Sequence, residues 1–216
     1  MRFHGLLISV LFLSCAGCGE PQLGVKIPFV ATWGGEPIGC EDAEIAMSDL
    51  RFYVSELSLI DSEGRSQALT LDQQLPWQQD DLALIDLEDG RGRCHNGSNE
   101  LYSYLVGFVP AGEYRGLHFT IGVPFERNHA NPLTAEPPLD NAAMHWHWRS
   151  GYKFLRAGVA TADDGFWSHL GSAGCEGTVR NVTGCRFPNR FSVVLPDFAI
   201  REHAIAVDLQ KLLNGT

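Results

Sequence analysis

Histidine and tryptophan are the residues of this chain whose types and spacing could support chemistry. Residues 144–148 read Met-His-Trp-His-Trp. In an extended segment, His145 and His147 would point to one face about 7 Å apart, because each residue rises about 3.3 Å, and Trp146 and Trp148 would occupy the other face. Two imidazoles at this spacing suit one metal ion, and a solvated or hydrogen-bonded pair is the equally good alternative.

Two more histidines are candidate metal ligands. His129 lies in the same long segment, and His169 shortly precedes the sequence Gly-Ser-Ala-Gly-Cys at 171–175, which we expect to be a turn held by a disulfide. A histidine beside such a turn is held rigidly, as metal ligands must be. The alternative for His169 is a hydrogen bond to the backbone.

The sequence lacks the common catalytic and nucleotide-binding motifs. G-x-S-x-G, H-E-x-x-H, the P-loop and G-x-G-x-x-G are all absent. We therefore expect no catalytic residues, and a binding protein rather than an enzyme. A metallohydrolase that uses His129, His145 and His147 is an alternative, for which Glu126 or Asp140 would have to supply the base.

The first residues have the pattern of an export signal. A short apolar run at 5–13 is too short to span a bilayer. The small residues before Cys18 resemble a bacterial lipobox, in which a peptidase cuts before a cysteine that carries lipid. Lipidation of Cys15 and an ordinary secretory signal are the alternatives. We expect a signal peptide over 1–17, a lipid anchor on Cys18 and a linker over 18–24.

Four further cysteines would remain in the exported chain, where disulfides form. They are Cys40, Cys94, Cys175 and Cys185. Sequence alone permits three pairings. The short Gly-rich loop between Cys175 and Cys185 favours a bond there, which leaves Cys40 with Cys94. A zinc site is the rival use of these cysteines, but no two of the four form a C-x-x-C pair.

Composition excludes several classes of protein. The 216 residues carry a net charge of −10, which repels the phosphates of nucleic acids and argues against nucleic-acid binding. With 44% hydrophobic and 19% charged residues, the chain is neither disordered nor a polytopic membrane protein. Its length suits one domain, which we expect over 25–216.

Short strands must position these side chains. Leu117, Phe119 and Ile121 share one face of such a strand, while His118 and Thr120 share the other. Similar runs occur at 25–33, 50–60, 68–71, 82–87, 102–109, 152–159, 191–195 and 204–209. Only residues 207–213 favour a helical turn. Short strands separated by Gly- and Pro-rich turns predict an antiparallel β-sandwich or barrel.

Residues 124–150 interrupt the strand pattern. A loop of this length in a compact domain is usually functional. Its aromatic and imidazole content argues against a fully solvated excursion. We therefore expect this long loop to carry the functional residues.

Several motifs along the chain resemble those of a known family. They are RFYVS at 51–55, LIDLEDG at 84–90, GVPF at 122–125, Asn-His at 128–129, WHWRSGYKF at 146–154, HLGSAGC at 169–175, Gly-Cys at 184–185 and PNR at 188–190. In order and residue type they resemble the MbnP-like family, also called the metallo-mystery pair four-cysteine proteins. The resemblance extends from about residue 25 to 213, nearly the whole exported chain.

The resemblance implies a copper-binding β protein of the periplasm or cell surface. Family members are encoded beside a di-haem enzyme related to bacterial cytochrome c peroxidases, called MbnH in the methanobactin case. That partner oxidises a tryptophan to kynurenine, whose aniline nitrogen lies at or near a Cu(I) site otherwise built from histidines. His129 and His169 match the recurrent histidines, and Trp33, Trp146 and Trp148 are the tryptophans available for modification.

Within this expectation, Trp33 ranks first among the tryptophans because it ends the first strand, before two glycines that permit close approach. His145 and His147 occupy positions that vary in the family and remain candidate ligands. Gly19 stands where an Asp would signal inner-membrane retention, so we expect a lipoprotein of the outer membrane. The runner-up function is an extracellular β-sandwich whose exposed Trp146, Trp148 and Tyr152 bind a sugar or a protein.

Overall fold

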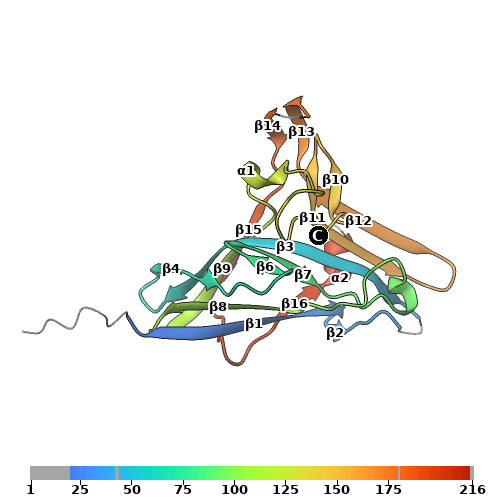
Figure 1. Cartoon of the computed structure of the whole chain (residues 1–216). Helices are drawn as coiled ribbons and strands as arrows, with labels where there is room; N and C mark the ends of the chain where they lie inside the picture. Colours follow the sequence, from blue (N-terminus) through green and yellow to red (C-terminus); the bar gives the residue numbers. More distant parts are fainter. Residues whose placement is uncertain (1–19, 42–43, 180, 215–216) are drawn as a thin grey trace, which may run out of the picture.

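Strands make up most of the described chain, which comprises residues 20–41, 44–179 and 181–214 of the computed structural model. They form two sheets in a sandwich-like arrangement and a separate two-stranded hairpin (Figure 1). The predicted antiparallel β class is thereby confirmed. Residues 1–17 and Cys18 lie outside the described residues. Within the described residues, no helix is long and apolar enough to cross a membrane.

The smaller sheet carries the first strand of the chain. Its strands are, in spatial order, β16 (Ile205–Asp208), β1 (Gln22–Trp33), β8 (Tyr104–Pro110) and β5 (Thr70–Leu71), with β2 (Glu36–Pro37) also paired to β1. β1 runs parallel to β16 and antiparallel to β8. The helix α2 (Leu209–Asn214) directly follows β16, in the region where the sequence favoured a helical turn.

The larger sheet is built around β3 (Ala46–Asp61), a strand of 16 residues. Four strands pair with β3, all antiparallel: β4 (Ser66–Ala68), β7 (Leu82–Asp86), β9 (Tyr114–Ile121) and β11 (Gly151–Ala160). The outer strands are β10 (His145–His147) and β12 (Gly165–Gly171) on β11, β6 (Gln78–Gln79) on β7 and β15 (Phe191–Leu195) on β9. The larger sheet therefore carries most of the candidate ligands.

Both faces of β3 are buried, because successive side chains of a strand point to opposite faces. Phe52 lies in the main core, where its ring packs edge-on against Phe29 of β1 at 5.4 Å between centroids. Tyr53 lies in a second cluster of buried side chains, where its ring packs edge-on against Tyr152 of β11. This second cluster also includes residues of the segment 124–150 and supports that segment.

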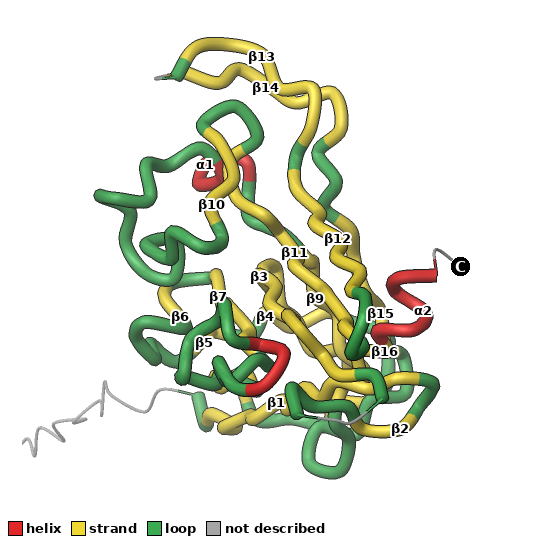
Figure 2. The backbone as a smooth tube through the Cα atoms, turned by 90° about the vertical axis from the view of Figure 1, so that its right-hand side faces the viewer, coloured by secondary structure: helices red, strands yellow, loops and turns green. Residues whose placement is uncertain are grey.

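Two disulfides are present, with the predicted pairings. Cys40 bonds to Cys94, the last residue of η1 (Gly92–Cys94), and both cysteines are buried in the main core. Cys175 bonds to Cys185 and joins the two strands of the hairpin, β13 (Ala173–Thr178) and β14 (Asn181–Phe187). This hairpin projects beyond the sheets in two views at right angles (Figures 1 and 2).

The region from 165 to 187 differs from the prediction. The sequence indicated a turn over 171–175, whereas Gly171 ends β12 and residues from Ala173 onward form β13. Side chains on both faces of β13 and β14 are largely exposed, so these strands show no alternation of apolar and polar residues. The predicted turn was therefore wrong, and three strands were missed.

Candidate metal centre

The long segment 124–150 is packed against the body of the protein. Tyr152 donates a hydrogen bond from its hydroxyl to the Leu139 carbonyl at 2.6 Å, and the Tyr53 hydroxyl donates to the Pro138 carbonyl at 3.1 Å. Met144 is fully buried in the same cluster. These contacts hold the loop against β3 and β11, so the side chains near its ends have defined positions.

Asn128, at the end of helix α1 (Phe125–Asn128), is a buried polar residue that the sequence analysis missed as a site residue. Its amide nitrogen donates to the Ser150 carbonyl at 3.2 Å and to the Ser172 hydroxyl at 3.3 Å. Its side-chain oxygen accepts a hydrogen bond from the Tyr152 backbone N–H at 2.9 Å. Asn128 thereby joins the loop to β11 and to the link before β13. Its place before His129 in the Asn-His motif was the only signal for it.

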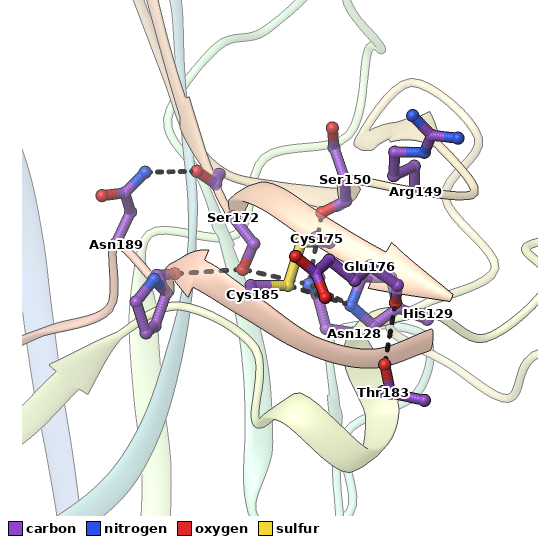
Figure 3. The surroundings of a disulfide bond; sticks show 12 residues. Asn128, His129, Arg149, Ser150, Ser172, Cys175, Glu176, Thr183, Cys185 and Asn189 are labelled. Atoms are coloured by element: carbon purple, nitrogen blue, oxygen red, sulfur yellow. Dashed lines mark hydrogen bonds between the residues drawn. A yellow bond between two sulfur atoms is a disulfide. The ribbon is translucent and has the colours of Figure 1, made fainter. Parts of the chain in front are cut away.

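His129 has one ring nitrogen fixed and the other turned toward the hairpin disulfide (Figure 3). Nδ1 lies 3.1 Å from the Trp148 carbonyl, which can only accept, so Nδ1 carries the proton and Nε2 has a lone pair. Nε2 lies 3.6 Å from Sγ of Cys185 and 3.4 Å from the Asn128 amide nitrogen. This fixed N–H and free lone pair are typical of a metal-ligating histidine.

The lone pair on Nε2 of His129 receives only a weak hydrogen bond. An asparagine amide has two protons. Those of Asn128 have closer acceptors, at 3.2 Å on Ser150 and 3.3 Å on Ser172, than the His129 nitrogen at 3.4 Å. Nε2 is therefore available to donate its lone pair to a metal ion.

His145 and His147 do not form the regular pair that the sequence predicted. The register of β10 shifts between them, so that His145 lies opposite Tyr152 and His147 lies opposite Gly151. Tyr152 and Gly151 are consecutive, so the simple two-residue alternation is lost. The expected 7 Å spacing on one face assumed an undistorted strand.

The half-buried His145 packs against Tyr152, with 5.2 Å between ring centroids. Burial lowers the pKa of His145, and the nearby His147, Lys153 and His129 lower it further. His145 is therefore neutral at pH 7 with a lone pair on one ring nitrogen. His147 is exposed, and its Nδ1 accepts a hydrogen bond from the Arg149 backbone N–H at 3.3 Å.

His169 lies on β12 beside Trp146. The two rings make an edge contact with 6.1 Å between centroids. The indole also lies close over Gly171, where an added Cβ would be 3.3 Å from the ring carbon Cε3 of Trp146. Burial lowers the pKa of His169, and the cations Arg156 and Lys153 lower it further, so the imidazole is neutral at pH 7.

The other two candidate tryptophans have different surroundings. Trp33 ends β1 and packs against the main core, in the smaller sheet, on the opposite side of the molecule from α1 and β10 in both views (Figures 1 and 2). Trp148 lies next to His147, with 5.5 Å between ring centroids, and the Arg149 guanidinium lies 5.0 Å above its ring. Trp146 is thus the candidate tryptophan in contact with His169.

The aromatic platform proposed for a sugar or protein ligand is incomplete. Tyr152 is fully buried, and its hydroxyl is bonded to Leu139. It therefore cannot stack on a ligand. Trp146 remains 49% exposed and Trp148 is half-buried. Neither Glu126 nor Asp140, the bases named for the hydrolase alternative, hydrogen-bonds to a histidine in the described structure.

Comparisons with known proteins agree with the motifs. The family model described as MbnP matches residues 22–216. The chain belongs to the MbnP family. A solved structure, MbnP from Methylosinus trichosporium, is similar with a TM-score of 0.77 and 27% sequence identity, over 90% of this chain and 78% of that chain. No curated protein matches the sequence. The family resemblance stated from the motifs is confirmed.

In this MbnP family protein the candidate ligands fall into two groups. His129 and His147 both lie near enough to His145 to lower its pKa, and His169 lies with Trp146. Within the described residues, three possible ligand atoms lie within 4.8 Å of one another in two places: His129 with Cys175 and Cys185, and Cys40 with Asp89 and Cys94. Both places contain a disulfide, whose sulfurs are not the thiolates that bind metals. Within the described residues, no three histidines have ligand atoms within 4.8 Å of one another.

Proposed function

We propose that this MbnP family protein binds copper and is not an enzyme. The observation that carries the proposal is the ring contact between Trp146 and His169, which joins a tryptophan available for modification to a histidine of the family pattern. Neutral imidazole is a good copper ligand, and two or three donors are enough for Cu(I). Bound copper would supply a redox-active ion at this surface.

The residues fit such a site in donor type. His169 and His145 are both kept neutral by burial and by nearby cations or imidazoles, so each has a lone pair at pH 7. His129 has its Nδ1 proton fixed by a carbonyl, which leaves Nε2 free. We assign His169 as the principal histidine of the copper site and keep His129, His145 and His147 as candidates for the remaining positions.

A nitrogen donor beside His169 would come from oxidation of Trp146. Oxidative cleavage of the indole between C2 and C3 takes up three waters, releases four electrons and four protons, and loses C2 as formate. It leaves a ketone and an aromatic amine in the side chain. Trp146 favours this reaction over Trp148 because the Arg149 guanidinium above the Trp148 ring opposes removal of an electron. Trp33 is the least favoured, since it lies far from the histidines.

We propose that a partner protein supplies the oxidising equivalents. We propose a di-haem enzyme of the cytochrome c peroxidase type. The 49% exposure of the Trp146 side chain supports an approach at the surface. We further propose that the protein is exported and held at the outer membrane through lipid on Cys18, facing the periplasm or the outside.

The test is to produce the chain with and without the di-haem protein encoded beside it, and to measure copper content and peptide masses. We expect kynurenine at Trp146 and one tightly bound copper only after co-production. Trp146→Phe should lose both, while Trp33→Phe should keep both. Full copper binding with every tryptophan intact would overturn the modification.

A separate pair of variants tests the histidine. His169→Ala should lose copper, and the matched control His95→Ala, at an exposed histidine after η1, should keep it. Retention of copper by His169→Ala would overturn the assignment of His169. Export and lipidation are tested by membrane fractionation of Cys18→Ala, which should become soluble.

A further inference from the structure

We propose that Cys175, Cys185 and His129 form a redox-gated metal site for a soft or borderline cation such as Zn²⁺ or Cu⁺. The site would be closed while the two cysteines are joined and would open when a thiol or phosphine reductant cleaves their bond. It does not rest on the copper function proposed above, because it uses no tryptophan and exists only in the reduced protein.

The distances suit a metal ion. The three ligand atoms all lie within 4.8 Å of one another, and Nε2 of His129 is 3.6 Å from Sγ of Cys185. A tetrahedral ion with bonds of about 2.3 Å to sulfur and about 2.0 Å to nitrogen sets these two donors about 3.5 Å apart. His129 is therefore already at the correct separation from Cys185, and the two sulfurs must move apart, to about 3.8 Å.

The scaffold on each side of the site does not depend on the disulfide. Cys175 and Cys185 are direct partners in the β13–β14 register, flanked by the pairs Ala173–Phe187 and Glu176–Gly184, so backbone hydrogen bonds keep their Cβ atoms close after reduction. His129 is held by the Trp148 carbonyl, in a different part of the chain. The three ligands would therefore stay together when the sulfurs separate.

The surroundings leave room for exchange of electrons, protons and metal. The hairpin projects from the body, and Cys185 is only partly buried (Figure 2). Gly184, next to Cys185, has nothing within 4 Å of the position of a Cβ, so the opposite face of β14 is also open beside this residue. A small reductant should thus reach this disulfide without unfolding the protein.

The second disulfide is a built-in control. Cys40 and Cys94 also lie with a third possible ligand, Asp89, but both residues are buried in the main core, at 5% and 0% exposure, and no imidazole belongs to this group. In the hairpin pair Cys175 is buried as well, at 6%, whereas Cys185 is partly exposed. We expect a mild reductant to leave the bond between Cys40 and Cys94 intact. Any metal binding that appears after mild reduction would then belong to the hairpin.

The hairpin disulfide takes up two electrons and two protons and becomes two thiols, while a dithiol reductant becomes a disulfide or a phosphine takes oxygen from water. A metal ion then displaces the thiol protons and binds two thiolates and the free Nε2 of His129. Reoxidation returns two electrons to an acceptor and releases the metal.

The experiment uses the full exported chain and Co²⁺ as an optical probe. The protein is treated with a water-soluble phosphine, and alkylation with mass analysis verifies that only Cys175 and Cys185 have become thiols. We expect sulfur-to-cobalt charge-transfer absorption and tetrahedral ligand-field bands in the reduced protein, saturating at one Co²⁺, and neither in the oxidised protein. Added Zn²⁺ should displace the cobalt.

Two variants identify the ligands. His129→Ala, reduced in the same way, should bind Co²⁺ at least about tenfold more weakly, a loss that second-shell changes alone can reach in metal sites. His95→Ala, at an exposed histidine after η1, should bind as the unchanged protein does. No cobalt spectrum after verified reduction, or equal affinity in His129→Ala, would overturn the proposal. The copper content of the oxidised protein is measured separately. A failure of the copper function can therefore be told apart from a failure of the redox-gated site.

Discussion

At the scale of single residues, Asp86 has a strongly shifted pKa. It is fully buried, and one of its carboxylate oxygens has no hydrogen-bond partner. Burial raises the pKa of Asp86 from 3.8 to about 8, with a further contribution from the carboxylate of Glu88, although Arg51 opposes the shift. Asp86 is therefore neutral at pH 7 in the folded protein and charged in the unfolded chain.

This shift predicts a loss of stability at high pH. The folded state binds one more proton than the unfolded state between pH 3.8 and about 8, so the contribution of Asp86 falls as pH rises through this window. Asp86→Asn removes the titration and should gain stability relative to the unchanged protein, by at most about 1.4 kcal/mol per pH unit. Urea unfolding of both proteins at several pH values measures their free energies of unfolding. A difference between the two proteins that does not change with pH would contradict the prediction.

Replacement of Asn128 tests how the candidate ligands are held in place. Asn128→Ala leaves the buried Tyr152 backbone N–H without its acceptor, which should cost about 1–3 kcal/mol. His129 should also lose orientation, so binding of cobalt by the reduced protein should weaken. Asn131→Ala, in an exposed turn of the same loop, is the control. Equal unfolding midpoints for the two variants would contradict this role.

At the scale of elements, the two disulfides should contribute unequally. Cys40 and Cys94 are 54 residues apart, and Cys175 and Cys185 are 10 apart. Because the entropy removed from the unfolded chain grows with loop length, loss of the first should cost about 4 kcal/mol and loss of the second about 3 kcal/mol. Denaturant unfolding of the two double Cys→Ser variants measures the difference, and a reversed order would contradict it.

The elements that the sequence predicted are those that bury one or both faces. β1, β3, β9 and β11 have apolar residues in the core, and their runs were recognised within a few residues. The strands from β12 to β14 bury little, so apolar periodicity could not reveal them. Candidate ligands were identified by residue type, but the bulge in β10 and the distance of Trp33 from the histidines follow from tertiary packing.

At the scale of the whole molecule, charge should govern the encounter with a partner. The chain carries 26 acidic and 16 basic residues, a net charge of −10. A di-haem partner with a basic patch would then associate more slowly as salt rises, because the Debye length falls to about 8 Å at 0.15 M. Association rates at increasing NaCl test this, and rates independent of salt would contradict it.

The long strand β3 also determines how the molecule opens. Its apolar side chains enter the main core on one face, and Tyr53 enters the second cluster, beneath the segment 124–150, on the other, so neither cluster can loosen without disturbing the other. Subglobal opening of this loop should therefore be rare, and the amides of β3 should exchange with solvent only through global unfolding. Any metal held by the loop would then slow hydrogen exchange throughout the sandwich.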